Sequence, residues 1–299
     1  MSAPDPSPAR LPLPGGRRDA RVRLHPLMSG EMRAPEGYLH KPSGPLSTAR
    51  GLSLHTRRST WRWIPVPAFL VEHPSAGHVL IDTGLHESIA ANPGEQLGKL
   101  GRAFTFRFSA EQSVARQLLD RGARPREIST VVMTHLHLDH ASAVQDFPQA
   151  TFVVDKREWA AAHGRAGGLR GYFPTQFDQP VAWRTVDFGS PEVEAFGPFG
   201  SALDLFGDGS VRLLSTPGHT AGHMSVLLRL RHREALLTID AAYTMRTIEE
   251  GALPALSDDS HRFERSLGEL QRYVKQTPGA LVIPGHDEQA WARLDPVYV

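Results

Sequence analysis

The stretch Thr134-His135-Leu136-His137-Leu138-Asp139-His140 decides how the rest of the chain is interpreted. It follows an apolar run, residues 128–133, and it offers three imidazoles and one carboxylate on a tight loop. Imidazole nitrogen and carboxylate oxygen are ligands that zinc and similar divalent ions accept, and two ions about 3.5 to 4 Å apart can share one activated water. A lone His is usually a surface or core residue, but this cluster predicts a metal site.

The composition narrows the classes of function. The chain has 299 residues, with 33 basic against 32 acidic side chains and a formal net charge of +1. Such a chain has no general field that recruits nucleic acid or an anionic membrane. It contains 0 Cys, which excludes disulfides, thiolate ligands and a Cys nucleophile. His and Asp are therefore left to bind any metal.

The sequence predicts a short tail followed by one domain. Residues 1–16 are rich in Pro and small residues and lack an apolar run, so we expect a disordered Pro-rich tail and no secretory signal. Residues 17–299 are expected to form a single domain, in which residues 17–62 show no clear period and form an extended N-terminal segment. No run approaches the roughly eighteen apolar residues that cross a bilayer, so we expect a soluble, cytoplasmic protein.

Apolar patterns predict alternating strands and helices. Predicted strands cover residues 66–72, 78–82, 128–133, 151–154, 211–214, 224–230, 235–239 and 280–283, and predicted helices cover 110–121, 156–163 and 259–275. Residues 164–209 are expected to hold short strands and loops. Asp82, in an Asp-Thr-Gly triplet without a second copy, is interpreted as a turn residue or as a support for a ligand.

Three further motifs fall where predicted strands end. His219 follows Thr-Pro-Gly, Asp240 closes the strand 235–239, and His286 follows Pro-Gly. Each alone would be weak, because Gly-His after a Pro is most often a turn. Two tetrahedral or five-coordinate ions need about seven ligands with one shared. The chain offers this number in His135, His137, Asp139, His140, His219, Asp240 and His286.

The order His-x-His-x-Asp-His, Gly-His, Asp and a final Gly-His resembles the metallo-β-lactamase superfamily, from about residue 65 to the C-terminus. The resemblance implies an α/β fold, the αββα sandwich, in which two mixed sheets pack face to face with helices outside. It implies two divalent ions, with Zn²⁺ as the expected metal. It assigns His135, His137 and His219 to the first ion, Asp139, His140 and His286 to the second, and Asp240 to both.

Residues 239–244, Ile-Asp-Ala-Ala-Tyr-Thr, and 285–287, Gly-His-Asp, are similar to the N-acyl homoserine lactone lactonases of this superfamily. In that family the matching Tyr hydrogen-bonds the substrate carbonyl, which makes Tyr243 a predicted catalytic residue. Two departures bear on substrate preference: Ala-Ser-Ala follows the His cluster where a Gly pair is common, and residues 189–209 look longer.

The expected reaction is opening of an N-acyl homoserine lactone ring, which is quorum quenching. A hydroxide shared by the two metals would attack the carbonyl, Tyr243 would stabilise the oxyanion, and Asp139 would protonate the leaving alkoxide. The expected acyl-chain pocket uses Met-bearing or aromatic segments without a clear period. Its candidates are Met28, Met32, Phe104, Phe106 and Phe108, for which core packing or a short strand is the alternative.

The same ligands could serve another esterase, a thioesterase of the glyoxalase II type, a β-lactamase or a phosphodiesterase. A phosphodiesterase favours a basic pocket, and no Lys or Arg cluster surrounds the ligands in the sequence. A redox diiron protein, which usually adds a flavin domain, and a metal-binding protein without catalysis are further alternatives. The expected partner is a small lactone or ester, without nucleic acid or membrane, and a homodimer stays open.

Overall fold

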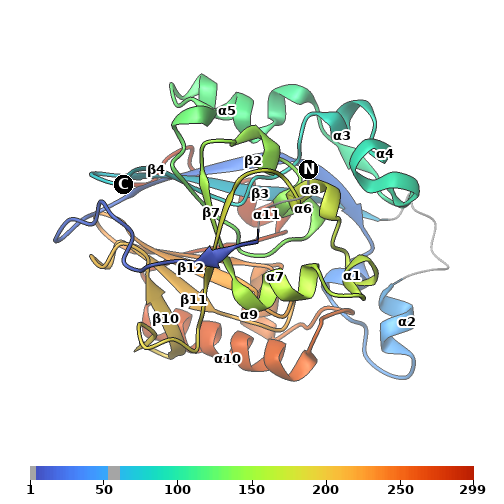
Figure 1. Cartoon of the computed structure of the whole chain (residues 1–299). Helices are drawn as coiled ribbons and strands as arrows, with labels where there is room; N and C mark the ends of the chain where they lie inside the picture. Colours follow the sequence, from blue (N-terminus) through green and yellow to red (C-terminus); the bar gives the residue numbers. More distant parts are fainter. Residues whose placement is uncertain (1–4, 53–60) are drawn as a thin grey trace.

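The computed structural model describes residues 5–52 and 61–299 as two β-sheets packed face to face with helices on both outer sides (Figure 1). This arrangement confirms the predicted αββα sandwich. Both sheets are mixed, because β4, β6, β7 and β8 run parallel in the first and β13 pairs parallel with β14 in the second. The order in the first sheet is β1 (Ser7–Pro8), β8 (Ala182–Val186), β7 (Thr151–Asp155), β6 (Thr130–Val132), β4 (Gly77–Ile81), β3 (Arg62–His73), β2 (Arg23–Ala34) and β5 (Phe106–Arg107). The order in the second is β14 (Leu281–Pro284), β13 (Glu234–Ile239), β12 (Met224–Arg229), β11 (Val211–Ser215), β10 (Phe199–Asp204) and β9 (Glu194–Phe196).

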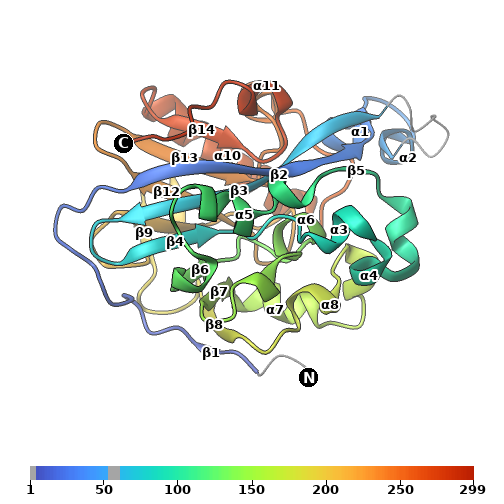
Figure 2. The same ribbon diagram turned by 90° about the horizontal axis from the view of Figure 1, so that it is seen from above.

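Helices cover the outer faces of both sheets. Over the first sheet lie α5 (Val114–Asp120), α3 (Ser88–Ala91) and α4 (Gly94–Leu97), and α10 (Ser260–Gln276) lies under the second (Figures 1 and 2). The remaining α-helices are α1 (Glu36–Leu39), α2 (Ser47–Gly51), α6 (Leu138–Ala141), α7 (Lys156–Ala162), α8 (Pro174–Phe177), α9 (Met245–Glu250) and α11 (Glu288–Trp291). Short 3₁₀ turns are η2 (Gly98–Ala103), η3 (Ala110–Gln112), η4 (Pro125–Glu127), η5 (Val144–Asp146) and η6 (Gly167–Arg170).

Both faces of the central strands are buried, which explains why their sequences read as apolar runs. In β3, Phe69 and Val71 point into the core between the sheets, whereas Leu70 packs under the outer helix α5. In β12, Val226 faces the inter-sheet core and Leu227 faces α10. Covered faces remove the apolar-polar alternation that marks a half-exposed strand.

The prediction of a disordered tail is wrong for residues 5–16. Strand β1 pairs with β8, and the Leu13 amide donates to the Leu205 carbonyl over 2.8 Å. Ala9, Leu11 and Leu13 pack against the inter-sheet core at every second position. An edge position tolerates the many prolines, since Pro lacks the amide hydrogen that a central strand needs. Residues 1–4 lie outside the described part of the chain.

The N-terminal segment 17–62 contributes strand β2 to the first sheet. Strand β2 pairs antiparallel with β3 from Arg23 to Ala34, with a register shift between Met28 and Glu31. Gly30 takes a φ of 78° at this shift, where a Cβ would meet the Phe108 ring at 2.8 Å. The irregularity breaks the alternation and hides the strand in the sequence. Residues 53–60 of this segment lie outside the described residues.

Among the described helices none is long and apolar enough to cross a bilayer.

Candidate metal centre

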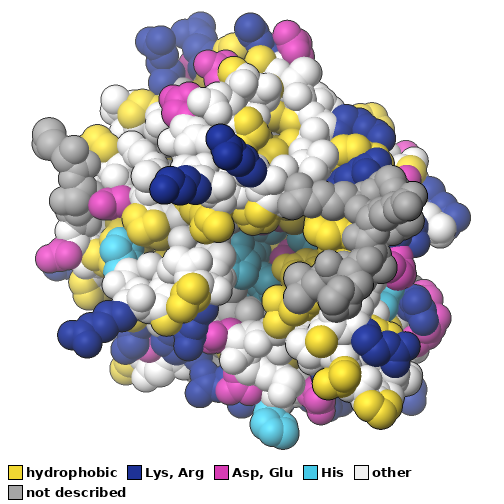
Figure 3. All heavy atoms as spheres, turned by 90° about the vertical axis from the view of Figure 1, so that its right-hand side faces the viewer, with side chains coloured by type: hydrophobic (Ala, Val, Ile, Leu, Met, Phe, Trp, Pro, Cys, Tyr) yellow, Lys and Arg dark blue, Asp and Glu magenta, His cyan; other side chains and the backbone are white. Residues whose placement is uncertain are grey.

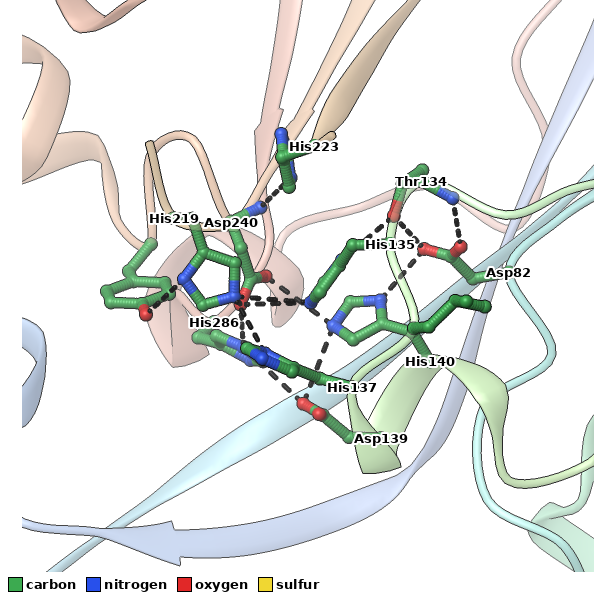
Figure 4. Close-up of polar contacts among 12 residues, drawn as sticks. Asp82, Thr134, His135, His137, Asp139, His140, His219, His223, Asp240 and His286 are labelled. Atoms are coloured by element: carbon green, nitrogen blue, oxygen red, sulfur yellow. Dashed lines mark hydrogen bonds and ion pairs between the residues drawn. The ribbon is translucent and has the colours of Figure 1, made fainter. Parts of the chain in front are cut away.

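The predicted ligands converge from loops that follow strands of both sheets, and their side chains point toward one another (Figure 4). His135 and His137 lie in the loop after β6, and Asp139 and His140 lie on α6 directly behind it. The other three follow the ends of strands in the second sheet: His219 after β11, Asp240 after β13 and His286 after β14. Strand ends hold the loops in place, so the rigid sandwich fixes the positions of these side chains.

The seven side chains form three overlapping groups. These are His135 with His137 and His219, His135 with His140 and Asp240, and Asp139 with His140 and His286, and the ligand atoms within each group lie within 4.8 Å of one another. His219 Nε2 is 3.0 Å from His137 Nδ1 and 3.2 Å from His135 Nε2. The first and third groups have the same members as the two ligand sets expected from the sequence, and the second group joins one histidine of each set to Asp240.

Asp240 lies between the two sets. Its Oδ2 atom is 3.2 Å from His219 Nε2 and 3.2 Å from His286 Nε2, and its Oδ1 atom is 3.5 Å from His140 Nε2. One carboxylate therefore faces ligands of both groups, which is the position expected of a bridging ligand.

The donor set fits divalent cations. Asp139 Oδ2, His140 Nε2 and Asp240 Oδ1 are buried at the centre without a hydrogen-bond partner among the described residues. Burying an unpaired polar atom costs roughly 1–3 kcal/mol, more for a charged one. Carboxylate oxygens and imidazole nitrogens that converge in this way are compensated when cations bind between them.

Partners outside the centre set the orientation of the histidine rings. His140 Nδ1 is 2.8 Å from Asp82 Oδ2, His286 Nδ1 is 2.9 Å from the Pro65 carbonyl, and His137 Nε2 is 2.8 Å from the Arg170 carbonyl. In each ring the other nitrogen points to the centre. Such outer partners fix the tautomer and the direction of a metal-binding imidazole.

The contacts of Asp82 agree with the interpretation of this residue as a support for a ligand. It has a φ of 57°, a left-handed conformation that Asp tolerates. Its carboxylate accepts hydrogen bonds from the Thr134 amide over 2.8 Å and the Thr134 hydroxyl over 2.7 Å, in addition to its contact with His140 (Figure 4). The triplet after β4 therefore braces the start of the His loop.

Sequence reasoning missed two supporting residues. Glu158, buried on α7, accepts hydrogen bonds from the Leu136 amide, the Gly222 amide and the Tyr172 hydroxyl, each over 3.0 Å. It thus ties the His135–His137 loop to the loop that carries His219. His223 is also buried, and its Nε2 accepts from the Asp240 amide over 3.2 Å. A lone Glu on a helix and a lone His in a strand-end loop carry no local signal that would have identified them.

Burial and charge prepare the ligands for a metal. Burial lowers the pKa of His135 and of His219 well below the ordinary value, so both rings are neutral and can offer a lone pair. Burial raises the pKa of Asp240, but His286, His219 and His140 outweigh it and hold this pKa well below its usual range. The centre therefore presents an anionic Asp240 beside two neutral imidazoles. At His140 and His286 burial lowers the pKa, but the neighbouring carboxylates outweigh it and raise the pKa above its ordinary value.

A cavity of about 520 Å³ opens over the centre. The histidines are visible at the bottom of a hollow bordered by hydrophobic side chains (Figure 3). The lining combines ligand residues with an apolar wall from the N-terminal segment and two loops; it includes His137, Asp139, His219, Met32, Tyr38, Phe104, Leu138, Leu169, Tyr172 and Leu256.

Of the five residues predicted for substrate binding, Met32 and Phe104 line this cavity. Phe106 and Phe108 are not among the lining residues; they are partly buried in an apolar cluster together with Phe104 and Leu138. Met28 does not line the cavity either, and 40% of it is exposed. Its backbone carbonyl accepts a hydrogen bond from Gln117 on α5, on the outer face of the sheet. The absence of a clear period in β2 had hidden which of its side chains face the site.

Tyr243 lies beside the centre and is fully buried. Its hydroxyl is 2.9 Å from His219 Nδ1, and its ring packs edge-on against His219 with centroids 5.5 Å apart. It lies in the turn between β13 and α9. Tyr243 is not among the residues that line the cavity.

The sequence model of the metallo-beta-lactamase superfamily matches residues 61–286. The chain belongs to the metallo-β-lactamase superfamily. Divalent metal ions are a property of this superfamily, and the His and Asp groups described above could hold them.

Among curated members of the superfamily, the chain is 37% identical over 234 residues to the N-acyl homoserine lactonase AttM of Agrobacterium fabrum, covering 77% of this chain and 84% of that one. It is 28% identical over 241 residues to an N-acyl homoserine lactonase of Bacillus cereus, covering 79% and 87%.

The fold is similar to solved structures of lactonases. An N-acyl homoserine lactone hydrolase with N-hexanoyl-L-homoserine bound at its catalytic metal centre aligns with a TM-score of 0.74 and 23% identity, over 93% of this chain and 98% of that one. The dizinc quorum-quenching lactonase AidC aligns with a TM-score of 0.59 and 14% identity, over 92% and 90%. At these identities the likeness shows the superfamily fold.

Proposed function

We propose that the protein is a metal-dependent hydrolase that opens the ring of N-acyl homoserine lactones, and so acts in quorum quenching. The observation that carries this proposal is the convergence of His135, His137, Asp139, His140, His219, Asp240 and His286 at the bottom of a largely apolar cavity. The 37% identity to a lactonase over most of both chains supports the lactone as the substrate.

We propose two Zn²⁺ ions, one held by His135, His137 and His219 and one by Asp139, His140 and His286, with Asp240 shared. When bound, such ions polarise a carbonyl and lower the pKa of water from about 15.7 toward 7. The dizinc character of the structurally similar lactonase AidC supports this number and this metal. Elemental analysis of the purified protein is expected to find two Zn per chain.

Asp139 is proposed to move the proton in ring opening. It lines the cavity, and its Oδ2 atom is buried without a hydrogen-bond partner among the described residues. Attack of a water on the lactone carbonyl releases one proton, and the alkoxide that leaves when the ring C–O bond breaks takes one up. A carboxylate at the cavity floor is placed to accept the first proton and to pass it to the alkoxide. Met32, Phe104 and Leu138 form an apolar wall for the acyl chain.

The test is a substrate panel followed by pH-stat titration of the released acid. N-Acyl homoserine lactones of increasing chain length are compared with simple lactones, thioesters and β-lactams, using Zn-loaded and chelator-stripped protein. We expect the highest kcat/KM on N-acyl homoserine lactones and no turnover without metal. Preference for a thioester or a β-lactam would assign another activity to the centre, and full activity of stripped protein would refute a metal mechanism.

A further inference from the structure

A second phenol, Tyr38 on α1, separates Tyr243 from the cavity. The two rings stack with centroids 5.6 Å apart and an interplanar angle of 22°, and the Tyr243 hydroxyl donates to the Tyr38 hydroxyl over 3.4 Å. Tyr38 is partly buried and lines the cavity together with Asp139 and His219, whereas Tyr243 is 0% exposed. A substrate in the cavity therefore meets the Tyr38 side chain.

The hydrogen bonds run from the centre to the cavity in one direction. His219 Nε2 faces Asp240 and the other histidines, so a neutral His219 that binds a metal through Nε2 carries its hydrogen on Nδ1. That hydrogen is donated to the Tyr243 oxygen, and Tyr243 in turn donates to Tyr38. No described residue accepts the Tyr38 hydrogen, which can therefore be donated to an oxygen in the cavity.

We propose that Tyr38 is the phenol that donates a hydrogen bond to a carbonyl oxygen of the substrate, and that Tyr243 acts through it as a positioning residue. This inference rests on the proposed lactonase function and deepens it. The alternative is the contact expected from the sequence, in which Tyr243 itself donates to the substrate.

The position of Tyr38 is built into the fold. The Ala255 amide donates to the Tyr38 carbonyl over 3.1 Å, and the Lys41 amide donates to the Leu253 carbonyl over 2.7 Å. The neighbouring His40 contacts the hydroxyl of Thr244, the residue after Tyr243, over 2.7 Å. These contacts hold α1 against the loop 253–258, part of which lines the cavity, and against the turn that carries Tyr243. The phenol therefore has little conformational freedom, which favours its use as a donor.

Tyr38 keeps its hydrogen at the pH of an assay. Burial raises the pKa of its hydroxyl above the ordinary value, although the hydrogen bond from Tyr243 lowers it in part. A neutral phenol donates to an acceptor such as a carbonyl oxygen. Tyr38 also lies outside residues 61–286, the part that the superfamily model matches, so this donor is an addition made by the N-terminal segment.

The test is the substitution Tyr38→Phe, which keeps the ring and its stack on Tyr243 and removes only the hydroxyl. With N-hexanoyl homoserine lactone we expect kcat/KM to fall about ten-fold or more, with metal content unchanged. A fall in kcat indicates the lactone carbonyl as the acceptor, and a rise in KM alone indicates the amide carbonyl of the acyl chain. Calorimetry with the ring-opened product N-hexanoyl-L-homoserine is expected to show a weaker affinity, by about five-fold or more.

The matched control is Tyr273→Phe on α10, which removes a hydroxyl that donates to Glu234 outside the site. It is expected to retain both kcat/KM and product affinity. If Tyr243 acts through Tyr38, the double variant Tyr38→Phe/Tyr243→Phe should be no less active than Tyr38→Phe alone.

Two failures are distinguishable. Wild-type protein that hydrolyses no lactone would refute the proposed function. An active wild type whose kcat/KM and product affinity are unchanged in Tyr38→Phe would overturn the role of Tyr38 alone, and additive losses in the double variant would return the substrate contact to Tyr243.

Discussion

Single residues outside the centre determine which atoms face it. Asp82 and the carbonyls of Pro65 and Arg170 each engage one nitrogen of a histidine and leave the other pointing inward. Their effect is on the affinity for metal, because a ring held in the binding orientation loses little entropy when the ion arrives.

Asp82→Asn is therefore expected to weaken metal binding. The amide replaces the anionic partner of His140, and loss of such an outer partner typically lowers metal affinity about 10- to 100-fold. Competition with a chelator measures this affinity. Asp155→Asn is the control, since Asp155 is equally buried but pairs with Arg157 and caps α7. Equal metal affinities in the two variants would contradict the role given to Asp82.

Glu158 should make the stability depend on pH. Burial raises the pKa of Glu158 to about 7, although its hydrogen bonds lower it, whereas the ordinary value is 4.5. Between these values the folded chain retains a proton that the unfolded chain has lost, so the contribution of Glu158 to stability falls as pH rises from about 4.5 to 7.

The substitution Glu158→Gln removes this titration. Urea unfolding at pH 5, 6, 7 and 8 is expected to show that the stability of the variant relative to wild type improves as pH rises through the window. A difference that stays constant with pH would show that Glu158 is ionised throughout.

At the scale of elements, β1 contributes to a sheet that it joins only at the edge. The first sixteen residues supply both the strand that pairs with β8 and the side chains of Leu11 and Leu13, which pack against the core. A chain that begins at residue 17 is expected to lose about 1–3 kcal/mol of unfolding free energy and several degrees of Tm, while kcat on the best lactone is retained. An unchanged Tm in thermal unfolding monitored by circular dichroism would show that β1 adds nothing.

The elements that sequence patterns predicted are those with unbroken apolar runs, such as β4, β12 and β13. Strands β1 and β2 escaped prediction because prolines and the bulge at Gly30 interrupt their patterns. The short helix α11 escaped because helices of one turn carry too few residues to show a period. These elements form through contacts with distant parts of the chain, which a short stretch of sequence does not reveal.

The same contrast holds for the site. All seven predicted ligands converge because their residue types and strand-end positions are written in the sequence, and the grouping agrees with the superfamily pattern. The cavity wall was predicted less well: Met32 and Phe104 line it and Met28 does not, because side-chain direction depends on the register of β2. Tyr38 had no motif at all.

At the scale of the whole molecule, the centre joins the two sheets. The His cluster follows the first sheet, and His219, Asp240 and His286 follow strands of the second. A bound metal therefore closes a long loop in a chain that has 0 Cys. Cross-linking of this kind stabilises the folded state relative to the unfolded chain.

Metal removal should accordingly lower the thermal stability. Chelator-stripped protein is expected to melt at a lower temperature than Zn-loaded protein, because free Zn²⁺ at one hundred times its dissociation constant stabilises the folded state by about 2.7 kcal/mol. Differential scanning calorimetry over a Zn²⁺ titration measures the effect, and Asp240→Ala should reduce it. A Tm that is independent of Zn²⁺ would contradict a metal that ties the sheets.

The cavity has walls of two different origins. Its floor comes from the part of the chain that the superfamily model matches, whereas the wall from Met32 to Tyr38 precedes that part. The N-terminal wall can therefore be exchanged without altering a single predicted ligand. Chimeras that carry this wall from one of the related lactonases should change which acyl chains are accepted while retaining the metal complement, which makes the segment a starting point for redesigning selectivity.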